Sequence, residues 1–388
     1  MLGLLAVAEL LGMSPWFAAS AAAPELRSLW GLTAGQAAWL TSAVQLGFVA
    51  GTLAAAVLNL ADLWPGRRYF AGAALLAAAA NLALLAVDGF GAALALRCLT
   101  GFALAGVYPP AMKMAATWFQ AERGLAIGAV VGALTVGKAT PFLVEAMGGA
   151  RLEPILLSTS AGAAVAALLV AAAYRDGPFA FPSRPFDWRL AGTVARLPEL
   201  RLVTGGYLGH MWELYSYWAW IAAFLAASVA ARGAATETGG LAFVAIAIGA
   251  VGCVWAGRVA DRIGRERVVT WSLATSGTCA LLVGFAFGRS LWILLPIVLV
   301  WGVAVIADSA QFSALVTEVA PAHAVGTALT LQTSLGFLLT LVTIQLVPPV
   351  VELVGWRWAF GMLAAGPVVG IACIGRLARR RSSSTAAR

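Results

Sequence analysis

Long apolar segments constrain the fold of this chain more than any other feature of its sequence. A bilayer-spanning helix needs about 20 mostly apolar residues, and stretches of that kind follow one another along the whole chain. They are rich in Ala, Leu and Gly and lack the alternation of β-barrel strands, so helices must satisfy the backbone in lipid. We therefore predict an all-α membrane protein with twelve transmembrane helices. The predicted spans are 2–22, 36–60, 69–87, 91–117, 124–147, 154–174, 203–228, 239–260, 268–288, 291–317, 323–347 and 355–377.

The balance of residue types also indicates a membrane location. Hydrophobic residues make up 61% of the chain and charged residues 11%, which leaves too few polar side chains to cover a water-soluble core. The net charge of +8 comes from arginines that gather on one side. With the N-terminus inside, the predicted inner loops and tail carry seventeen arginines and the outer loops five. This positive-inside pattern predicts a bacterial inner-membrane protein with both termini in the cytoplasm, and no nucleic-acid partner.

The chain divides into two similar halves. A polar interval at 175–201 separates six predicted spans from six, so we expect domains at 1–174 and 202–388 joined by a cytoplasmic linker, with a basic tail at the end. Glu9 begins "ELLGMSPWF" and Glu213 begins "ELYSYWAWI", 204 positions later, and a Trp follows each Glu after seven places. Parallel repeats of this kind are typical of two-domain transporters.

Three loop and helix motifs resemble those of a known family. "ADRIGRERV" after the eighth span, which begins at Ala260, is a good copy of an acidic-Arg-x-Gly-Arg loop signature, and "LWPGRR" after Asp62 is a degraded copy. Arg97 and Gly101 fit an Arg-x-x-x-Gly signature in the fourth span. In order and spacing these motifs resemble the major facilitator superfamily over essentially the whole chain. The resemblance implies two pseudo-symmetric six-helix bundles around a central cavity, which rock between inward-open and outward-open states.

The same motifs predict a conformational latch at the cytoplasmic ends of the helices. Its acids lie near helix ends, and its arginines are expected to reach across the interface between the bundles. For Arg97 the resemblance implies a role in proton coupling or in stabilising a bundle, and we group it with the latch. The expected latch residues are Asp62, Arg67, Arg68, Arg97, Asp261, Arg262 and Arg265.

Five ionisable side chains lie deep in predicted spans: Glu9, Lys138, His210, Glu213 and Asp308. A charge at the centre of a bilayer costs at least about 2.5–3.5 kcal/mol, so such residues usually serve a function or are paired. The family arrangement implies that spans 1, 4, 7 and 10 line the cavity, which would place both glutamates, the histidine and the aspartate against water. Lys138 is then free to pair with Glu9, Asp308 or the substrate. Alternatively, His210 and Glu213 hydrogen-bond one another and fix their helix.

Aromatic and amide side chains complete the expected site. Trp16 and Tyr217 share helix faces with the acids, which suits stacking or cation–π contact with a flat or cationic solute. Gln311 follows Asp308 by three positions, and it either faces the cavity or joins two helices. The expected substrate-binding and proton-binding residues are Glu9, Trp16, Lys138, His210, Glu213, Tyr217, Asp308 and Gln311.

Missing motifs narrow the functional class. The sequence has no phosphate-binding glycine loop, no paired metal-ligand spacing and no hydrolase elbow, so we expect neither an enzyme nor a cofactor or metal. The fifth span lacks the Gly-Pro pair of drug/proton antiporters, and spans 2 and 8 lack the arginine that nitrate-type members of the family would show.

The sequence thus predicts a proton-coupled symporter or antiporter that moves a small organic solute by alternating access. The solute would carry an amine or a flat ring, the partners would be the solute, protons and the lipid bilayer, and the protein would act as a monomer. Two alternatives stay open. One is uptake or facilitated diffusion of an organic carboxylate drawn to Lys138, and the other is a membrane receptor or assembly factor that kept the fold and lost transport.

Overall fold

The computed structural model describes residues 1–119, 123–179, 186–234 and 238–386, apart from the side chains of 61, 62, 123 and 384–386. All regular elements of this described part are helices and none is a strand, which confirms the all-α prediction. The N-half, residues 1–174, contains α1 (Leu2–Met13), η1 (Ser14–Phe17), α2 (Ala18–Ala21), α3 (Ala23–Trp30), α4 (Ala34–Val57), α5 (Leu60–Leu63), α6 (Gly66–Leu82), η2 (Ala83–Ala86), α7 (Phe90–Leu104), α8 (Tyr108–Ala116), α9 (Arg123–Gly148) and α10 (Leu152–Ala173).

The linker forms α11 (Trp188–Arg196). The C-half, residues 202–388, follows within α12 (Pro198–Ala230) and contains α13 (Gly239–Ala247), α14 (Gly249–Ile263), α15 (Arg265–Ala286), α16 (Leu291–Ala307), α17 (Ser309–Val319), η3 (Ala322–Ala324), α18 (Val325–Val354), α19 (Trp356–Ala359), η4 (Phe360–Ala364) and α20 (Ala365–Ala386).

Within the described residues, eleven straight or broken helices are long and apolar enough to cross a membrane. They coincide with eleven of the predicted spans to within a few residues at most ends. The remaining predicted span lies inside α12, which has 33 residues but is not among the eleven. Its polar stretch around His210 and Glu213 lowers its hydropathy, so its membrane location follows from its length and its place in the bundle.

Local sequence signals set where several helices start and stop. α4 begins with a capping box: Thr33 Oγ1 accepts from the Gln36 N–H, and Gln36 Oε1 accepts from the Thr33 N–H. Gly31, with φ of 62°, ends α3 in the left-handed region. α7 stops at Leu104 and α8 starts at Tyr108. The two prolines that follow suit the first turn of a helix but not its interior, so the fourth span is broken there.

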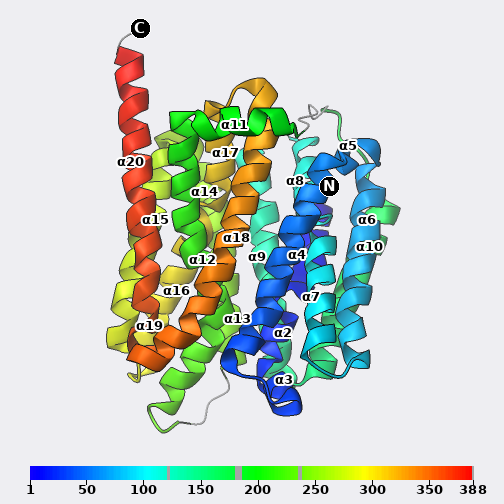
Figure 1. Cartoon of the computed structure of the whole chain (residues 1–388), viewed down its shortest axis with the longest axis vertical. Coiled ribbons are helices and arrows are strands. Elements are labelled where there is room, and N and C mark those ends of the chain that lie inside the picture. Colours follow the sequence, from blue (N-terminus) through cyan, green and yellow to red (C-terminus); the bar gives the residue numbers. More distant parts are fainter. Residues whose placement is uncertain (120–122, 180–185, 235–237, 387–388) are drawn as a thin grey trace.

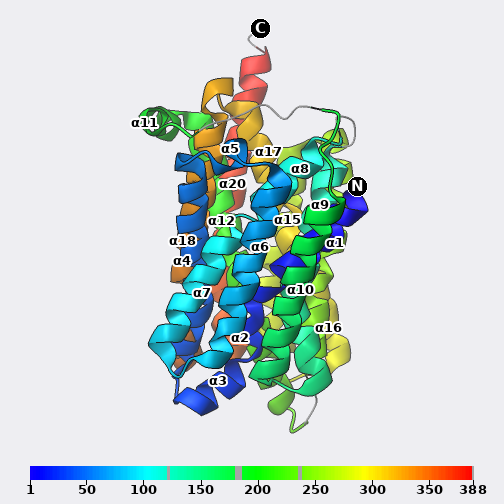
Figure 2. The same ribbon diagram turned by 90° about the vertical axis from the view of Figure 1, so that its right-hand side faces the viewer.

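The two halves stand side by side, and α11 of the linker lies across one end of the molecule (Figure 1). Both termini lie toward that end, which we call the linker end, and α20 projects beyond the body there (Figures 1 and 2). We call the other end, where α3 lies, the opposite end. The N-half contacts the C-half mainly through α4 against α18 and through α9 against α13 and α14.

Small residues form the contact between α9 and α14. Gly124 and Gly128 of α9 face Gly257 and Cys253 of α14. A Cβ at Gly128 would lie 2.7 Å from the Cys253 carbonyl oxygen, and one at Gly257 would lie 2.6 Å from the Gly124 carbonyl oxygen. The two backbones therefore nearly touch, as they do where small residues recur at membrane helix crossings.

Candidate functional site

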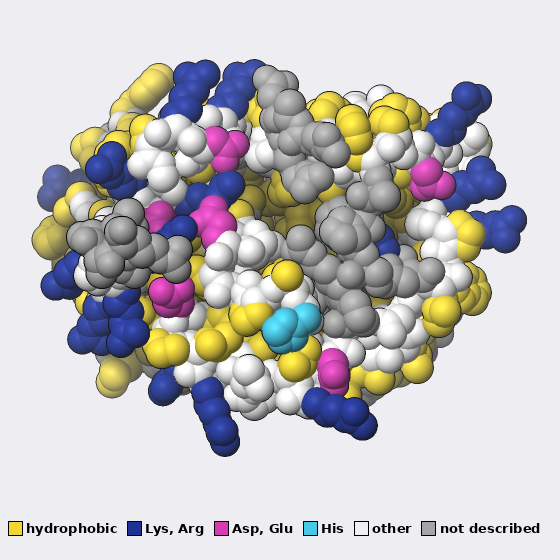
Figure 3. Space-filling model, turned by 90° about the horizontal axis from the view of Figure 1, so that it is seen from above, with side chains coloured by type: hydrophobic (Ala, Val, Ile, Leu, Met, Phe, Trp, Pro, Cys, Tyr) yellow, Lys and Arg dark blue, Asp and Glu magenta, His cyan; other side chains and the backbone are white. Residues whose placement is uncertain are grey.

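A cavity of about 750 Å³ lies between the halves. Its walls come from α4, α8 and α9 on one side and from α12, α17 and α18 on the other. Asn59, Asp261 and Thr317, which lie near helix termini at the linker end, also line it. Viewed from that end, the molecule is hollowed in the middle, with hydrophobic side chains at depth and Lys and Arg side chains around the rim (Figure 3). The cavity is therefore reached from the linker end.

The cavity wall is aromatic and polar rather than acidic. Four tyrosines line it, together with serine and threonine hydroxyls from α4, α17 and α18. The tyrosines are Tyr69, Tyr108, Tyr207 and Tyr215. Among its described charged side chains, Lys113 and Arg265 are basic and Asp261 is acidic. The expected acidic chamber is wrong for this conformation, because the acids of the helix interiors lie behind the wall.

An aromatic cluster closes the cavity toward the opposite end. Phe48 of α4 and Phe337 of α18 have ring centroids 4.5 Å apart, and Trp16 lies 5.1 Å from Phe48. One and a half turns further from the linker end on α4, Ser42 Oγ accepts a hydrogen bond from Gln345 Nε2 of α18 at 3.0 Å. These contacts join the N-half to the C-half, so the space between the halves is closed at one end and open at the other.

Lys138 of α9 is buried directly behind this cluster. Its ammonium donates a hydrogen bond to Tyr215 Oη at 2.5 Å and lies 3.7 Å from the centre of the Trp16 ring. Trp218 is a third aromatic neighbour, with its ring centre at 5.3 Å. Because Tyr215 and Trp218 belong to α12 and also line the cavity, Lys138 connects the N-half to the C-half at the cavity wall.

Glu9 of α1 is completely buried, and neither of its carboxylate oxygens has a hydrogen-bond partner among the described residues. The charge of Lys138 is close enough to act on it, although the two side chains form no ion pair in the described structure. The expectation that Glu9 faces water is therefore wrong here. Of the expected partners of Lys138, Glu9 is its electrostatic neighbour and Asp308 lies elsewhere.

Glu213 of α12 lies in a dry contact inside the C-half. Its Oε1 accepts from Trp301 Nε1 at 2.7 Å, and its Oε2 accepts from Ser276 Oγ at 2.7 Å. The Tyr217 ring is tilted against that of Trp301, with centroids 4.6 Å apart, and Tyr217 Oη donates to the Val298 carbonyl at 3.0 Å. Both predicted site residues are buried and do not line the cavity, because partners on α15 and α16 hold them away from it.

His210 and Asp308 form a second buried pair. His210 Nδ1 lies 2.9 Å from Asp308 Oδ1, and both side chains are 1% exposed. Asp308 sits at the break between α16 and α17. The alternative in which His210 bonds Glu213 is wrong, since each has a different partner. Tyr207, which lines the cavity, has its ring 6.0 Å from that of His210, so this pair lies one layer behind the wall.

Gln311 is the predicted binding residue that lines the cavity. Its Oε1 accepts a hydrogen bond from Arg265 Nη1 at 2.8 Å. The structure thus brings Glu9, Lys138 and Trp16 together in one place and His210 with Asp308 in another. It keeps Glu213 with Tyr217 in a third.

Arg97 of α7 holds the break in the first span. Its guanidinium donates to the carbonyls of Pro15 and Trp16, at 3.0 and 2.5 Å, and to Asn81 Oδ1 at 2.9 Å. A fourth bond reaches the Leu40 carbonyl. All these partners belong to the N-half, so its placement in a latch between the halves is wrong. Arg97 thus bonds backbone carbonyls where α1 gives way to η1, and of these the Pro15 carbonyl also accepts from the Ala18 N–H.

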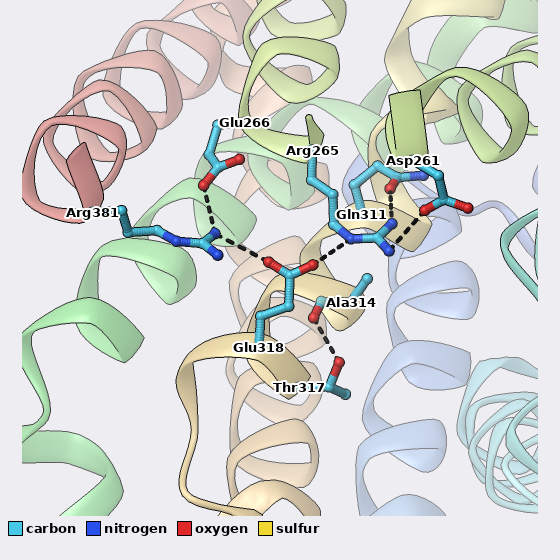
Figure 4. A network of polar contacts seen from close by, with 8 residues as sticks. All are labelled: Asp261, Arg265, Glu266, Gln311, Ala314, Thr317, Glu318 and Arg381. Carbon is cyan, nitrogen blue, oxygen red and sulfur yellow. Dashed lines mark hydrogen bonds and ion pairs between the residues drawn. The ribbon is translucent and has the colours of Figure 1, made fainter. Parts of the chain in front are cut away.

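Two of the predicted latch residues of the C-half, Asp261 and Arg265, belong to a network of ion pairs (Figure 4). Arg265 bonds Asp261 at 3.0 Å and Glu318 at 2.7 Å, and Arg381 bonds Glu266 at 2.6 Å and Glu318 at 3.0 Å. These pairs join α14, α15, α17 and α20, all in the C-half. The expectation that Arg265 reaches across the interface is therefore wrong in this conformation.

The other predicted latch residues contribute no contact between the halves in the described part. Arg67, Arg68 and Arg262 are exposed and bond no described side chain, while the side chain of Asp62 lies outside the described residues. Asp261 does face the N-half, since a Cβ at Gly124 would lie 3.2 Å from its Oδ2.

The sequence analysis did not include three aromatic residues of the cavity wall, Tyr207, Tyr215 and Phe337, among the expected site residues. Each lies in an apolar or aromatic run, and no Asp, Glu, Lys or Arg lies three or four positions away on the same helix face. For Tyr215 the only sequence signal lies in the other half of the chain. Its hydroxyl group accepts a hydrogen bond from Lys138, which the sequence analysis did identify as a deep cation.

Comparisons with known proteins agree with this architecture. The family model described as Major Facilitator Superfamily matches residues 5–344 and 241–388. One similar solved structure is described as a bacterial homolog to the human lysosomal transporter Spinster, in an inward-facing and occupied conformation. The two sequences are 13% identical, the superposition covers 97% of this chain and 96% of that chain, and the TM-score is 0.73.

A second similar structure is the human organic anion transporter MFSD10 (TETRAN), at 15% identity, with 96% of this chain and 98% of its own covered and a TM-score of 0.67. The comparison with curated proteins finds no match. At these identities the structures show the fold, and the family model covers nearly the whole chain. The chain therefore belongs to the major facilitator superfamily and is a multi-pass membrane transporter of a solute, not an enzyme.

Proposed function

We propose that this protein is a proton-coupled secondary transporter that carries a small organic solute across a bacterial inner membrane by alternating access. The observation that carries the proposal is the cavity between the halves, open at the linker end and closed at the other end by Trp16, Phe48 and Phe337. With the arginine-rich linker end in the cytoplasm, this arrangement is an inward-open state. One chain supplies the whole cavity, which supports a monomer.

The cavity wall indicates a flat organic solute with hydrogen-bonding groups. The volume of the cavity falls within the range of about 300–1,000 Å³ found for small-molecule sites. Four tyrosines offer ring faces and hydroxyls, and Gln311 offers an amide beside them. A second candidate is a flat organic anion, because Lys113 and Arg265 lie on the wall and Asp261 is itself bonded to Arg265. An amine loses its expected partners, since the deep acids are buried.

Glu9 and Lys138 are the proposed proton site. The Lys138 ammonium gains from the Trp16 ring and the Tyr215 oxygen, and both interactions depend on its charge. Transfer of a proton from Lys138 to Glu9 would leave two neutral groups, which tolerate burial better than charges do. The same transfer would weaken the bond from Lys138 to Tyr215 and with it one contact between the halves. Proton movement would thereby be linked to opening of the opposite end.

Proteoliposomes containing a pH-sensitive dye test this proposal. A solute found by ligand-induced thermal stabilisation should drive proton movement in the native protein and in Glu153→Gln, which changes an exposed acid at the start of α10. Glu9→Gln and Lys138→Met should bind the solute and move no protons. Normal proton movement in both variants would contradict the proton site. Solute binding without solute or proton movement in the native protein would instead favour a receptor.

A further inference from the structure

A second hollow, separate from the cavity, lies on the C-half between the start of α12 and the last turns of α20. It has a volume of about 540 Å³ and is lined by Pro198, Arg201, Leu202, Arg376, Arg379 and Arg380. We call it the arginine groove. Four of its six lining residues are arginines, and among the described residues no acidic side chain lines it. It is therefore a concentrated positive site on the surface of the C-half.

The arginines of the groove are not engaged with the rest of the protein. Arg201, Arg376 and Arg380 are exposed and bond no described group, and Arg379 donates only to the Gly375 carbonyl of its own helix. The next residue, Arg381, behaves differently, since it is bonded to Glu266 and Glu318. The groove thus brings together charges that are left without a counter-charge, while an adjacent arginine is neutralised.

The groove lies at the depth where a bilayer changes from hydrocarbon to headgroups. The last span begins at Trp356. Counted from there, about 20 helical residues at about 1.5 Å each cross the hydrocarbon core of about 30 Å and end at Arg376. The helix then continues to Ala386, beyond the body of the molecule (Figure 1). Arg376, Arg379 and Arg380 therefore occupy the first turns outside the hydrocarbon.

An apolar stripe runs from the groove toward the membrane centre. Val368 and Val369 are 66% and 53% exposed, and Ala372 is also exposed. Val368, Ala372 and Arg376 are spaced by four residues, so they lie on one face of α20. A molecule bound here would meet positive charge at its head and apolar surface along its tail.

We propose that the arginine groove binds the phosphate-bearing headgroup of an anionic phospholipid, such as phosphatidylglycerol or cardiolipin, whose acyl chains lie along the α20 stripe. Basic pockets between transmembrane helices are suited to such headgroups. Guanidinium groups bind phosphate oxygens through paired hydrogen bonds. The lipid would join α12 to α20 beside the Arg381 network and so stabilise the packing of the C-half.

Lipid titration of the full-length protein tests the proposal. Phosphatidylglycerol would be titrated into protein held in phosphatidylcholine nanodiscs, with binding followed by native mass spectrometry and thermal stability. The triple variant Arg376→Gln, Arg379→Gln, Arg380→Gln should bind phosphatidylglycerol on the order of 100-fold more weakly, since each basic residue near an anionic surface contributes a factor of about five.

The matched control is Arg175→Gln, Arg258→Gln, Arg267→Gln, which removes three exposed arginines at the linker end outside the groove. It should bind the lipid as the native protein does. A variant with lysine at 376, 379 and 380 should retain most of the binding, and all variants should melt alike in pure phosphatidylcholine.

Three results would overturn the proposal. Native affinity in the glutamine variant would show that the groove is not the site. Equal losses in the groove variant and in the control would show a response to total charge. Stabilisation by inorganic phosphate or glycerol 3-phosphate as strong as that by the lipid would assign the groove to a free phosphate compound.

Discussion

Glu9 and Glu213 hold the same position in the two repeats, yet their surroundings differ. In the C-half, both oxygens of Glu213 accept hydrogen bonds, from Trp301 and Ser276. In the N-half, Glu9 has no described hydrogen-bond partner and lies near Lys138. One acid is thus bonded within the helix packing, while the other is unpaired among the described residues, which is the state that we propose for a proton carrier.

The helices that carry these acids differ in the same way. The first span breaks after Met13, where η1 begins with Ser14 and Pro15, whereas α12 runs unbroken past Ala219, the residue that corresponds to Pro15. Arg97 bonds the carbonyls at the break, and Trp301, 204 positions after Arg97, bonds Glu213 instead. The side chains at these two matching positions thus have different partners. Arg97 bonds the carbonyls at a helix break, and Trp301 bonds a carboxylate.

The largest effect is expected from removing Arg97. In Arg97→Leu, the Trp16 carbonyl and Asn81 Oδ1 lose a buried donor, while the Pro15 carbonyl keeps the Ala18 N–H. Each unpaired acceptor costs about 1–3 kcal/mol, so the free energy of unfolding should fall by several kcal/mol. Trp301→Phe removes a single donor and should cost less. Unfolding in mixed detergent, followed by tryptophan fluorescence, measures both, with Arg67→Leu as the exposed control. Equal stability of Arg97→Leu and Arg67→Leu would rule out the role of Arg97 at the break.

Exchanging the proline between the halves should have the next largest effect. Ala219→Pro places a proline inside α12 and should destabilise the protein by about 3 kcal/mol or more. Pro15→Ala should change stability by less than about 1 kcal/mol, because Arg97 still bonds the carbonyls at the break. Thermal melting in detergent compares the two variants. Similar losses in both would show that the two spans tolerate proline equally and would remove this part of the contrast.

Replacing each acid by leucine tests the central difference directly. Glu213→Leu leaves the Trp301 N–H unpaired and the Ser276 hydroxyl with only the Leu273 carbonyl at 3.3 Å, so it should destabilise by about 2–4 kcal/mol. Glu9→Leu removes a buried carboxylate without described hydrogen bonds and should leave stability unchanged or raise it. Chemical unfolding of the two variants side by side gives the measurement. A larger loss in Glu9→Leu than in Glu213→Leu would reverse the assignment of packing and proton-carrying roles.

The smallest expected effect comes from Ser276→Ala. This change removes one of the two hydrogen bonds to Glu213, and it should cost about 1 kcal/mol. It should leave solute-driven proton movement intact, since Glu213 lies outside the proposed proton site. Thermal melting and the dye assay in proteoliposomes measure the two properties. Loss of proton movement with native stability would return Glu213 to the proton pathway.

The membrane fold could be predicted from the sequence because its signals are local. Apolar runs located the spans, and the loop after Ile263 carried the family signature. Glu9, Lys138 and Asp308 are all buried, whereas the resemblance had implied that Glu9 and Asp308 face water. Their side-chain partners could not be predicted, because helical periodicity gives the face of a residue but not the helix that lies against it. Trp301, the partner of Glu213, is 88 residues away.

The same limit explains the latch. Arg265 lies four residues after Asp261, and this spacing already favours a bond within one half. Its bonds to Gln311 and Glu318 depend on how α17 packs beside α15, which no local pattern records. Whether the proposed proton and substrate residues act as such stays a prediction.

The seam between α9 and α14 has a mechanical consequence. Glycines bring the two backbones together there, so in the proposed alternating-access cycle this contact would be the line about which the halves rotate. The α4–α18 edge, which is held by aromatic rings and an amide, would then be the side on which the two halves separate. Gly128→Ala would place a methyl group against the Cys253 carbonyl oxygen and should hinder this rotation. Crosslinking rates across the α4–α18 edge would measure the effect.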